Sequence, residues 1–145
     1  MALGLAAAIS CSGDSTGPQV ASCTEQTASV NVMISVGSSI AFDWTPACQV
    51  ALLVVENDQG SDRWWIATFD PDADIDPTIE ANRIAPRVTF GQMPATATHS
   101  YGPEDLIAGT TYTVALWRIL PKDSPVHCQQ SAGSACLIAV KTFTR

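Results

Sequence analysis

The feature that most constrains this chain is a two-residue alternation of apolar and polar side chains, repeated in short segments between glycines and prolines. Residues 30–36 alternate in this way, and residues 40–44 repeat the pattern after Gly37, until Pro46 closes the segment. Successive side chains of a β-strand point to opposite faces of a sheet, so a period of two predicts half-buried strands and not helices.

Five further segments carry strand signals. Residues 50–55 are a continuous apolar run, which is typical of a central strand that is covered on both faces. The remaining segments span residues 63–69, 84–90, 111–120 and 135–143. Residues 78–83 have room for one helical turn. About seven short strands in about 120 residues predict an all-β fold, an antiparallel β-sandwich.

Two segments carry motifs of a known family. In Leu106-Ile-Ala-Gly109-Thr110-Thr-Tyr112 a leucine lies six residues before a tyrosine with a Gly-Thr turn between them, and Ile40-Ala-Phe42-Asp-Trp44-Thr-Pro46 places a tryptophan in a strand. Residues 28–145 thereby resemble a fibronectin type III domain, an immunoglobulin-like β-sandwich. The resemblance implies that the Tyr112 hydroxyl bonds back to the backbone and that Trp44 packs in the core. It carries no activity.

The resemblance also implies a sheet arrangement. The segments 50–55, 63–69, 111–120 and 135–143 are expected to lie in one sheet. The chain between Trp44 and Tyr112 is longer than the family needs. We therefore expect a long insertion between the third and sixth strands, within residues 57–94, and insertions of this kind often carry a domain's individual function.

The amino terminus resembles the export signal of a bacterial lipoprotein. Residues 1–10, MALGLAAAIS, are uncharged and apolar but too short to span a bilayer. Ala8-Ile9-Ser10-Cys11 is similar to a lipobox, although Ala8 stands where Leu is usual. The resemblance implies a signal segment (1–10), a flexible tether (11–22) starting at a lipidated Cys11, and a folded domain (23–145) at a bacterial cell envelope or surface. The alternatives are a plain signal peptide and a disordered start with an unpaired cysteine.

The cysteine count supports this layout. The five cysteines are Cys11, Cys23, Cys48, Cys128 and Cys136. If Cys11 carries lipid, the other four can form two disulfides. Cys23 precedes the first strand and Cys48 follows the second, so an antiparallel pair places them at one end, while Cys128 and Cys136 bracket the last loop. We predict Cys23–Cys48 and Cys128–Cys136, with Cys48–Cys128 as the competing pair.

Composition argues against several classes of function. Fourteen acidic against seven basic residues give a formal net charge of -7, which disfavours binding of nucleic acid or an anionic membrane through a basic patch. The single GxSxG match, Gly13-Asp14-Ser15-Thr16-Gly17, lies in the predicted tether and not at a strand-to-helix turn, and neither His99 nor His127 has an obvious nucleophile. We therefore expect a protein that is not an enzyme and needs no cofactor.

One loop offers a weak calcium hypothesis. Acidic residues occupy alternate positions at Asp70, Asp72, Asp74 and Asp76. Alternating carboxylates can converge on a hard cation. The EF-hand pattern fails, however, because Ile75 stands where glycine is required and Ala81 where a bidentate glutamate belongs. A solvated acidic loop is the preferred interpretation.

The tryptophans supply the candidate binding face. Trp64 and Trp65 are adjacent in a strand and must point to opposite faces, and Trp117 alternates with the core positions around it. We expect Trp117 and either Trp64 or Trp65 to project from one sheet, unless the insertion covers them as a second small core. The leading hypothesis is a non-catalytic envelope lipoprotein with an adhesive, structural or protein-binding role. Alternatives are a carbohydrate-binding module, whose partner is a glycan, and a small secreted hydrolase.

Overall fold

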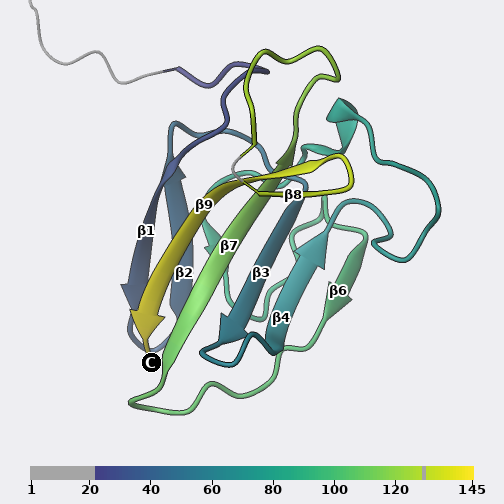
Figure 1. Cartoon of the computed structure of the whole chain (residues 1–145). Helices are drawn as coiled ribbons and strands as arrows, with labels where there is room; N and C mark the ends of the chain where they lie inside the picture. The colour runs from purple at the N-terminus through teal and green to yellow at the C-terminus, as the bar shows by residue number, and fades with distance from the viewer. Residues whose placement is uncertain (1–21, 129) are drawn as a thin grey trace, which may run out of the picture.

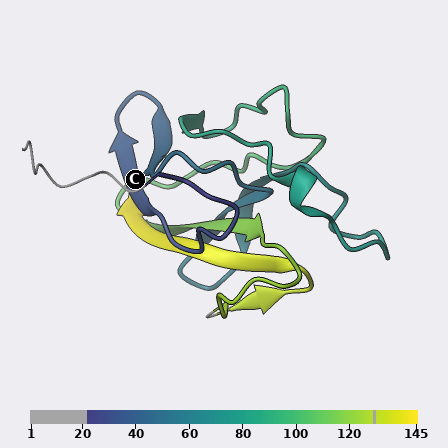
Figure 2. The ribbon, with the colours of Figure 1, turned by 90° about the horizontal axis from the view of Figure 1, so that it is seen from above.

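The alternating segments fold into two antiparallel sheets. This computed structural model describes residues 22–128 and 130–145 (Figure 1). The smaller sheet has the order β1-β2-β5, where β1 is Asn31–Val36, β2 is Ile40–Thr45 and β5 is Val88–Thr89. Figure 2 shows it as a layer separate from the larger sheet. The predicted all-β sandwich is therefore confirmed.

The larger sheet has six strands in the order β6-β4-β3-β7-β9-β8. They are β3 (Leu52–Asn57), β4 (Asp62–Ala67), β6 (His99–Tyr101), β7 (Thr111–Ile119), β8 (Ser131–Ala132) and β9 (Ala135–Thr144). The four segments expected to share one sheet do so, as β3, β4, β7 and β9. The predicted helical turn is the 3₁₀ helix η1 (Ile79–Ala81). Sequence reasoning missed β6 and β8, because two or three residues are too few to show an alternation.

The core lies between the sheets and is built from the inner-facing residues of both. Phe42, Leu53, Val55, Trp64 and Leu116 are fully buried there. Trp44 is also buried, and its indole Nε1 donates a hydrogen bond to the Cys48 carbonyl oxygen at 2.6 Å, which satisfies the one polar atom of the ring. The expected core position of Trp44 is confirmed.

The turn before β7 has the geometry expected of a tyrosine corner. The Ile107 backbone N–H donates to the Tyr112 hydroxyl oxygen at 2.8 Å, and the Tyr112 side chain is buried. Its ring centroid lies 5.8 Å from that of Phe143 on β9. One side chain thus holds the loop to the strand and covers the end of the core.

Both predicted disulfides are present. Cys23–Cys48 joins α-carbons 5.2 Å apart, and Cys128–Cys136 joins α-carbons 5.4 Å apart. The competing Cys48–Cys128 pairing is therefore wrong. Cys11, the proposed lipidation site, lies outside the described residues, as do the signal segment and nearly all of the tether.

An arginine fastens the segment that leads into β1. Arg118 of β7 is buried, and its guanidinium donates to the carbonyl oxygens of Gln49, Thr24, Glu25 and Thr27 at 2.9–3.3 Å. Burial lowers the pKa of this guanidinium from its ordinary value, with the nearby Glu25 acting in the opposite direction. Four carbonyl acceptors satisfy a buried cation without a carboxylate in direct contact, and they tie residues 24–27 to the sheet.

Candidate binding face on the six-stranded sheet

The outer face of the six-stranded sheet, turned toward the viewer in Figure 1, carries two rows of mainly apolar side chains. The strand register places the first row across β9, β7, β3, β4 and β6, as Val140, Ala115, Val54, Trp65 and Tyr101. The second row runs beside it, as Leu137, Trp117, Leu52, Ala67 and His99. We call these ten residues the outer face.

The structure decides between the two adjacent tryptophans. Trp64 points inward and is 1% exposed, with its ring centroid 5.2 Å from that of Phe90 and 6.5 Å from that of Phe42. Its inclusion among the candidate binding residues is therefore wrong, since a side chain in the main core is closed to a partner. Trp65 points outward and is half-buried, and Trp117 is half-buried on the same face.

Large and small side chains alternate on the outer face. Trp65 precedes Ala67 on β4 and Trp117 follows Ala115 on β7, each pair with one residue between its members. Ala67 is 0% exposed and Ala115 is 9% exposed, although both belong to the outer face. Other side chains therefore cover these two alanines, while Trp65 and Trp117 are themselves half-buried. Tyr101 and Val140 remain about half exposed, at 43% and 53%.

The insertion covers one end of the outer face. Ala51, Ile119 and Ala135 form a second apolar cluster, against which Trp117 packs together with Phe69 and Ala81 from the insertion. The alternative expectation of a second small core is thus correct at this end. Trp117 therefore contacts this cluster although it belongs to the outer face, whereas Trp65 is not part of the cluster.

Polar side chains border the face beside β6. The Tyr101 hydroxyl donates to Glu104 Oε1 at 2.6 Å, and Arg63 is ion-paired with the other carboxylate oxygen. These two hydrogen bonds, Tyr101 first, lower the pKa of Glu104. The rings of Trp65 and Tyr101 are nearly parallel, at 18°, with centroids 6.5 Å apart. Sequence reasoning missed this group because Arg63 and Glu104 are 41 residues apart.

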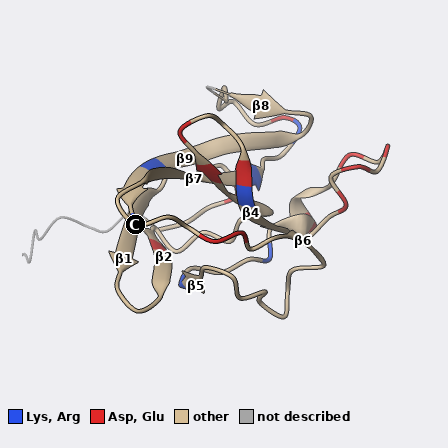
Figure 3. Ribbon diagram, turned by 90° about the horizontal axis from the view of Figure 1, so that it is seen from below, with Lys and Arg blue, Asp and Glu red and all other residues tan. Residues whose placement is uncertain are grey.

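The acidic loop borders the face beyond the end of β4, whereas Arg63 lies at the start of that strand. Asp70, Asp72, Asp74 and Asp76 are all exposed, and Figure 3 shows their segment extending beyond β6. A cavity of about 260 Å³ lies between this loop and the β8–β9 turn, with Leu52 of the outer face in its lining. Across residues 22–128 and 130–145, no three His, Cys, Asp or Glu side chains come close enough together to hold a metal ion.

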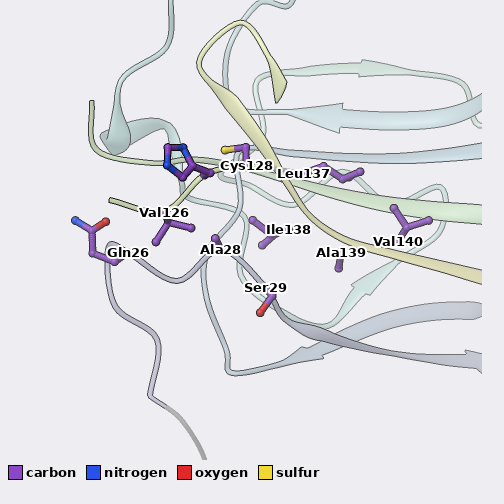
Figure 4. A pocket seen from close by; sticks show the side chains of 10 residues that line it. Gln26, Ala28, Ser29, Val126, Cys128, Leu137, Ile138, Ala139 and Val140 are labelled. Carbon is purple, nitrogen blue, oxygen red and sulfur yellow. The ribbon is translucent and has the colours of Figure 1, made fainter. Parts of the chain in front are cut away.

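A groove of about 490 Å³ continues the apolar surface around the β9 edge (Figure 4). Ala28 and Ser29, before β1, form one wall, and Ile138 and Ala139 of β9 form the other. Leu137 and Val140 line the groove as well as belonging to the outer face.

The two histidines lie apart from each other. His127 lines the groove, whereas His99 lies on the outer face with its Nδ1 3.0 Å from the hydroxyl oxygen of Thr98, its neighbour in sequence. Within the described part of the chain, neither imidazole forms an ion pair with a carboxylate.

The edges of the six-stranded sheet are poorly suited to pairing with another chain. β6 has three residues and is followed by Gly102 and Pro103, and β8 has two residues. Lys141 on β9 is paired with the fully buried Val114, so it points toward the inner side of the sheet, yet it is exposed. Short edges and an inward-directed lysine are common barriers to edge-to-edge association. The outer face has no comparable barrier at its centre.

Comparison with known proteins assigns no family, since no family model, curated protein or solved structure matches this chain. Among the described residues no helix is long and apolar enough to cross a membrane. The two disulfides indicate an oxidising, extracytoplasmic environment.

Proposed function

We propose that this protein is a non-catalytic binding module of a bacterial cell envelope, which holds its partner against the outer face. One observation carries the proposal. Two rows of mainly apolar residues cross the sheet, and the end that includes Trp65, Tyr101 and Val140 stays uncovered by the insertion. Soluble proteins seldom expose contiguous apolar surface without a use for it, and central aromatic residues with a polar border are typical of binding hot spots.

The remaining parts of the chain support this arrangement. Lipidation of Cys11 would anchor the domain, and the tether would give the face freedom to reach a partner. The Cys23–Cys48 disulfide and the Arg118 hydrogen bonds fasten the segment that follows the tether, so the domain is held firmly where it joins its anchor. The same layout suits an adhesive, a structural or a protein-binding role.

A binding assay with matched variants tests the proposal. We expect fluorescently labelled full chain carrying Cys11→Ala to bind envelope material from the producing bacterium, and Trp65→Ala with Tyr101→Ala to weaken that binding by about tenfold or more. The control is Met33→Ala with Ile107→Ala, which removes exposed apolar side chains away from the face. Equal binding by both double variants, with circular dichroism showing both folded, would contradict the proposal.

A carbohydrate-binding module is the second candidate. The observation that favours it is the near-parallel Trp65–Tyr101 ring pair beside the Arg63–Glu104 ion pair, because sugar rings stack on aromatic faces while their hydroxyls bond to planar charged groups. A glycan array separates the candidates. Binding of a neutral oligosaccharide that is lost in Trp65→Ala would favour this function over protein recognition.

A further inference from the structure

The charges around the outer face are mostly negative. Glu56 lies on β3 two residues beyond Val54 of the first row, and Asp62 on β4 is its cross-strand partner. Asp70 and Asp76 line the cavity at the other end of the face, and Glu104 lies beside β6. The border of the face therefore has carboxylates on three sides.

The cationic side chain at this border, Arg63, already has an ion-pair partner. Arg63 is ion-paired with Glu104, whose second oxygen accepts the Tyr101 hydroxyl. By contrast, the described residues provide no ion pair for Glu56 or Asp62. Like charges directly opposite on neighbouring strands destabilise a sheet. Consistent with this, burial first and Asp62 second raise the pKa of Glu56. The fold thus tolerates a repulsive pair near Tyr101, the most exposed aromatic residue of the described chain.

A cationic side chain from a partner would relieve that repulsion. Its charge could lie between Glu56 and Asp62, while its alkyl stem packs against the rings of Trp65 and Tyr101. A neutral sugar would stack on the same rings but would leave the two carboxylates uncompensated. An anionic polymer would be repelled.

We propose that the outer face docks a partner protein whose contact patch has an apolar centre flanked by lysine or arginine, with one cation placed at Glu56 and Asp62. This inference rests on the proposed function, because it names the occupant of the same face. The apolar centre meets Trp65, Val54 and Trp117, and the basic flank meets the carboxylates. Complementary charge of this kind selects among partners and speeds association more than it raises affinity.

The test selects ligands without presupposing their composition. Random dodecapeptides displayed on phage are selected on full chain carrying Cys11→Ala, and the best sequences are made as free peptides. We expect apolar residues flanked by lysine or arginine, with affinity falling about fivefold or more between about 50 and about 500 mM NaCl. Glu56→Gln with Asp62→Asn should remove most of the salt dependence, while the exposed Asp123→Asn, in the loop after β7, should leave it unchanged.

Different outcomes of this experiment test the inference and the proposed function separately. Suppose that the selected peptides need Trp65, lack basic residues and bind equally well to the Glu56→Gln, Asp62→Asn variant. That result would overturn the basic partner but would still support the outer face as a binding face. Trp65-dependent binding of neutral oligosaccharides alone would overturn a protein partner. If Trp65→Ala with Tyr101→Ala changes no binding, both the proposed function and this inference fail, and if no peptide is selected, the basic protein partner is overturned.

Discussion

Single side chains set the character of the outer face. Trp65 and Trp117 are half-buried, and Ala67 and Ala115, which lie two positions away from them on the same face, are buried. Trp117 packs against the cluster of Ala51, Ile119 and Ala135. Tyr101 and Val140 are the most exposed apolar residues of the face.

Tyr112→Phe tests the tyrosine corner at the scale of one atom. The substitution keeps the ring that packs against Phe143 but removes the acceptor of the Ile107 N–H. We expect the free energy of unfolding to fall by about 1–2 kcal/mol, because a part-buried donor loses its partner. Urea denaturation measures it, with Tyr101→Phe, an exposed hydroxyl, as the control. An unchanged midpoint would mean that water replaces the hydroxyl at no cost.

Glu56→Gln tests how the Glu56 carboxylate changes the pH dependence of the free energy of unfolding. The pKa of Glu56 is raised, so the folded state binds this proton more tightly than the unfolded state, whose pKa is about 4.5. Glu56 therefore lowers the stability as pH rises from below 4.5 through the raised value. We expect Glu56→Gln to be more stable than the parent at pH 7 and to lose that advantage in acid, as thermal unfolding at several pH values would show.

Glu80→Gln is the control, because the pKa of Glu80 is shifted in the opposite direction from that of Glu56. The Thr78 hydroxyl bonds to the Glu80 carboxylate and lowers its pKa, which favours the folded state above the ordinary value of 4.5. Its removal should therefore not stabilise the protein at pH 7. Stabilisation by both substitutions would mean that overall negative charge, and not the Glu56–Asp62 pair, is responsible.

At the scale of elements, the two disulfides close loops of different length and should stabilise the fold by different amounts. Cys23–Cys48 joins the entering segment to the end of β2 across 25 residues, whereas Cys128–Cys136 joins the loop after β7 to β9 across 8. A longer closed loop removes more freedom from the unfolded chain. Both links lie near the same end of the sandwich as the Arg118 hydrogen bonds.

Paired substitution to alanine measures this difference. By loop closure we expect loss of Cys23–Cys48 to cost about 3.5 kcal/mol and loss of Cys128–Cys136 about 2.5 kcal/mol. The free energy of unfolding in guanidinium, under non-reducing conditions, checks both values. A larger loss for the shorter loop would show that native contacts around Cys136, and not chain entropy, determine the effect.

At the scale of the whole molecule, anchoring and folding should be separable. Among the described residues, the core draws on positions 28 and onward, and we expect the proposed anchor to form no part of it. We expect Cys11→Ala to move the protein from the membrane fraction to the soluble fraction with the same unfolding midpoint as the parent. Mass spectrometry of the parent should find a lipid on Cys11, and an unmodified mature protein that still begins at Met1 would refute the anchor.

The sequence by itself determined the longer strands, the sandwich and both disulfides, because each follows from local periodicity or from positions at strand ends, while the tyrosine corner followed from the family resemblance of residues 106–112. Only the tertiary structure decided that Trp65 and not Trp64 faces outward, since a period of two separates the faces without saying which one meets the second sheet. The same holds for the Arg63–Glu104–Tyr101 group, the Arg118 hydrogen bonds and the cluster around Trp117. These contacts join residues far apart in the chain, and no local pattern records which distant neighbour a side chain will meet.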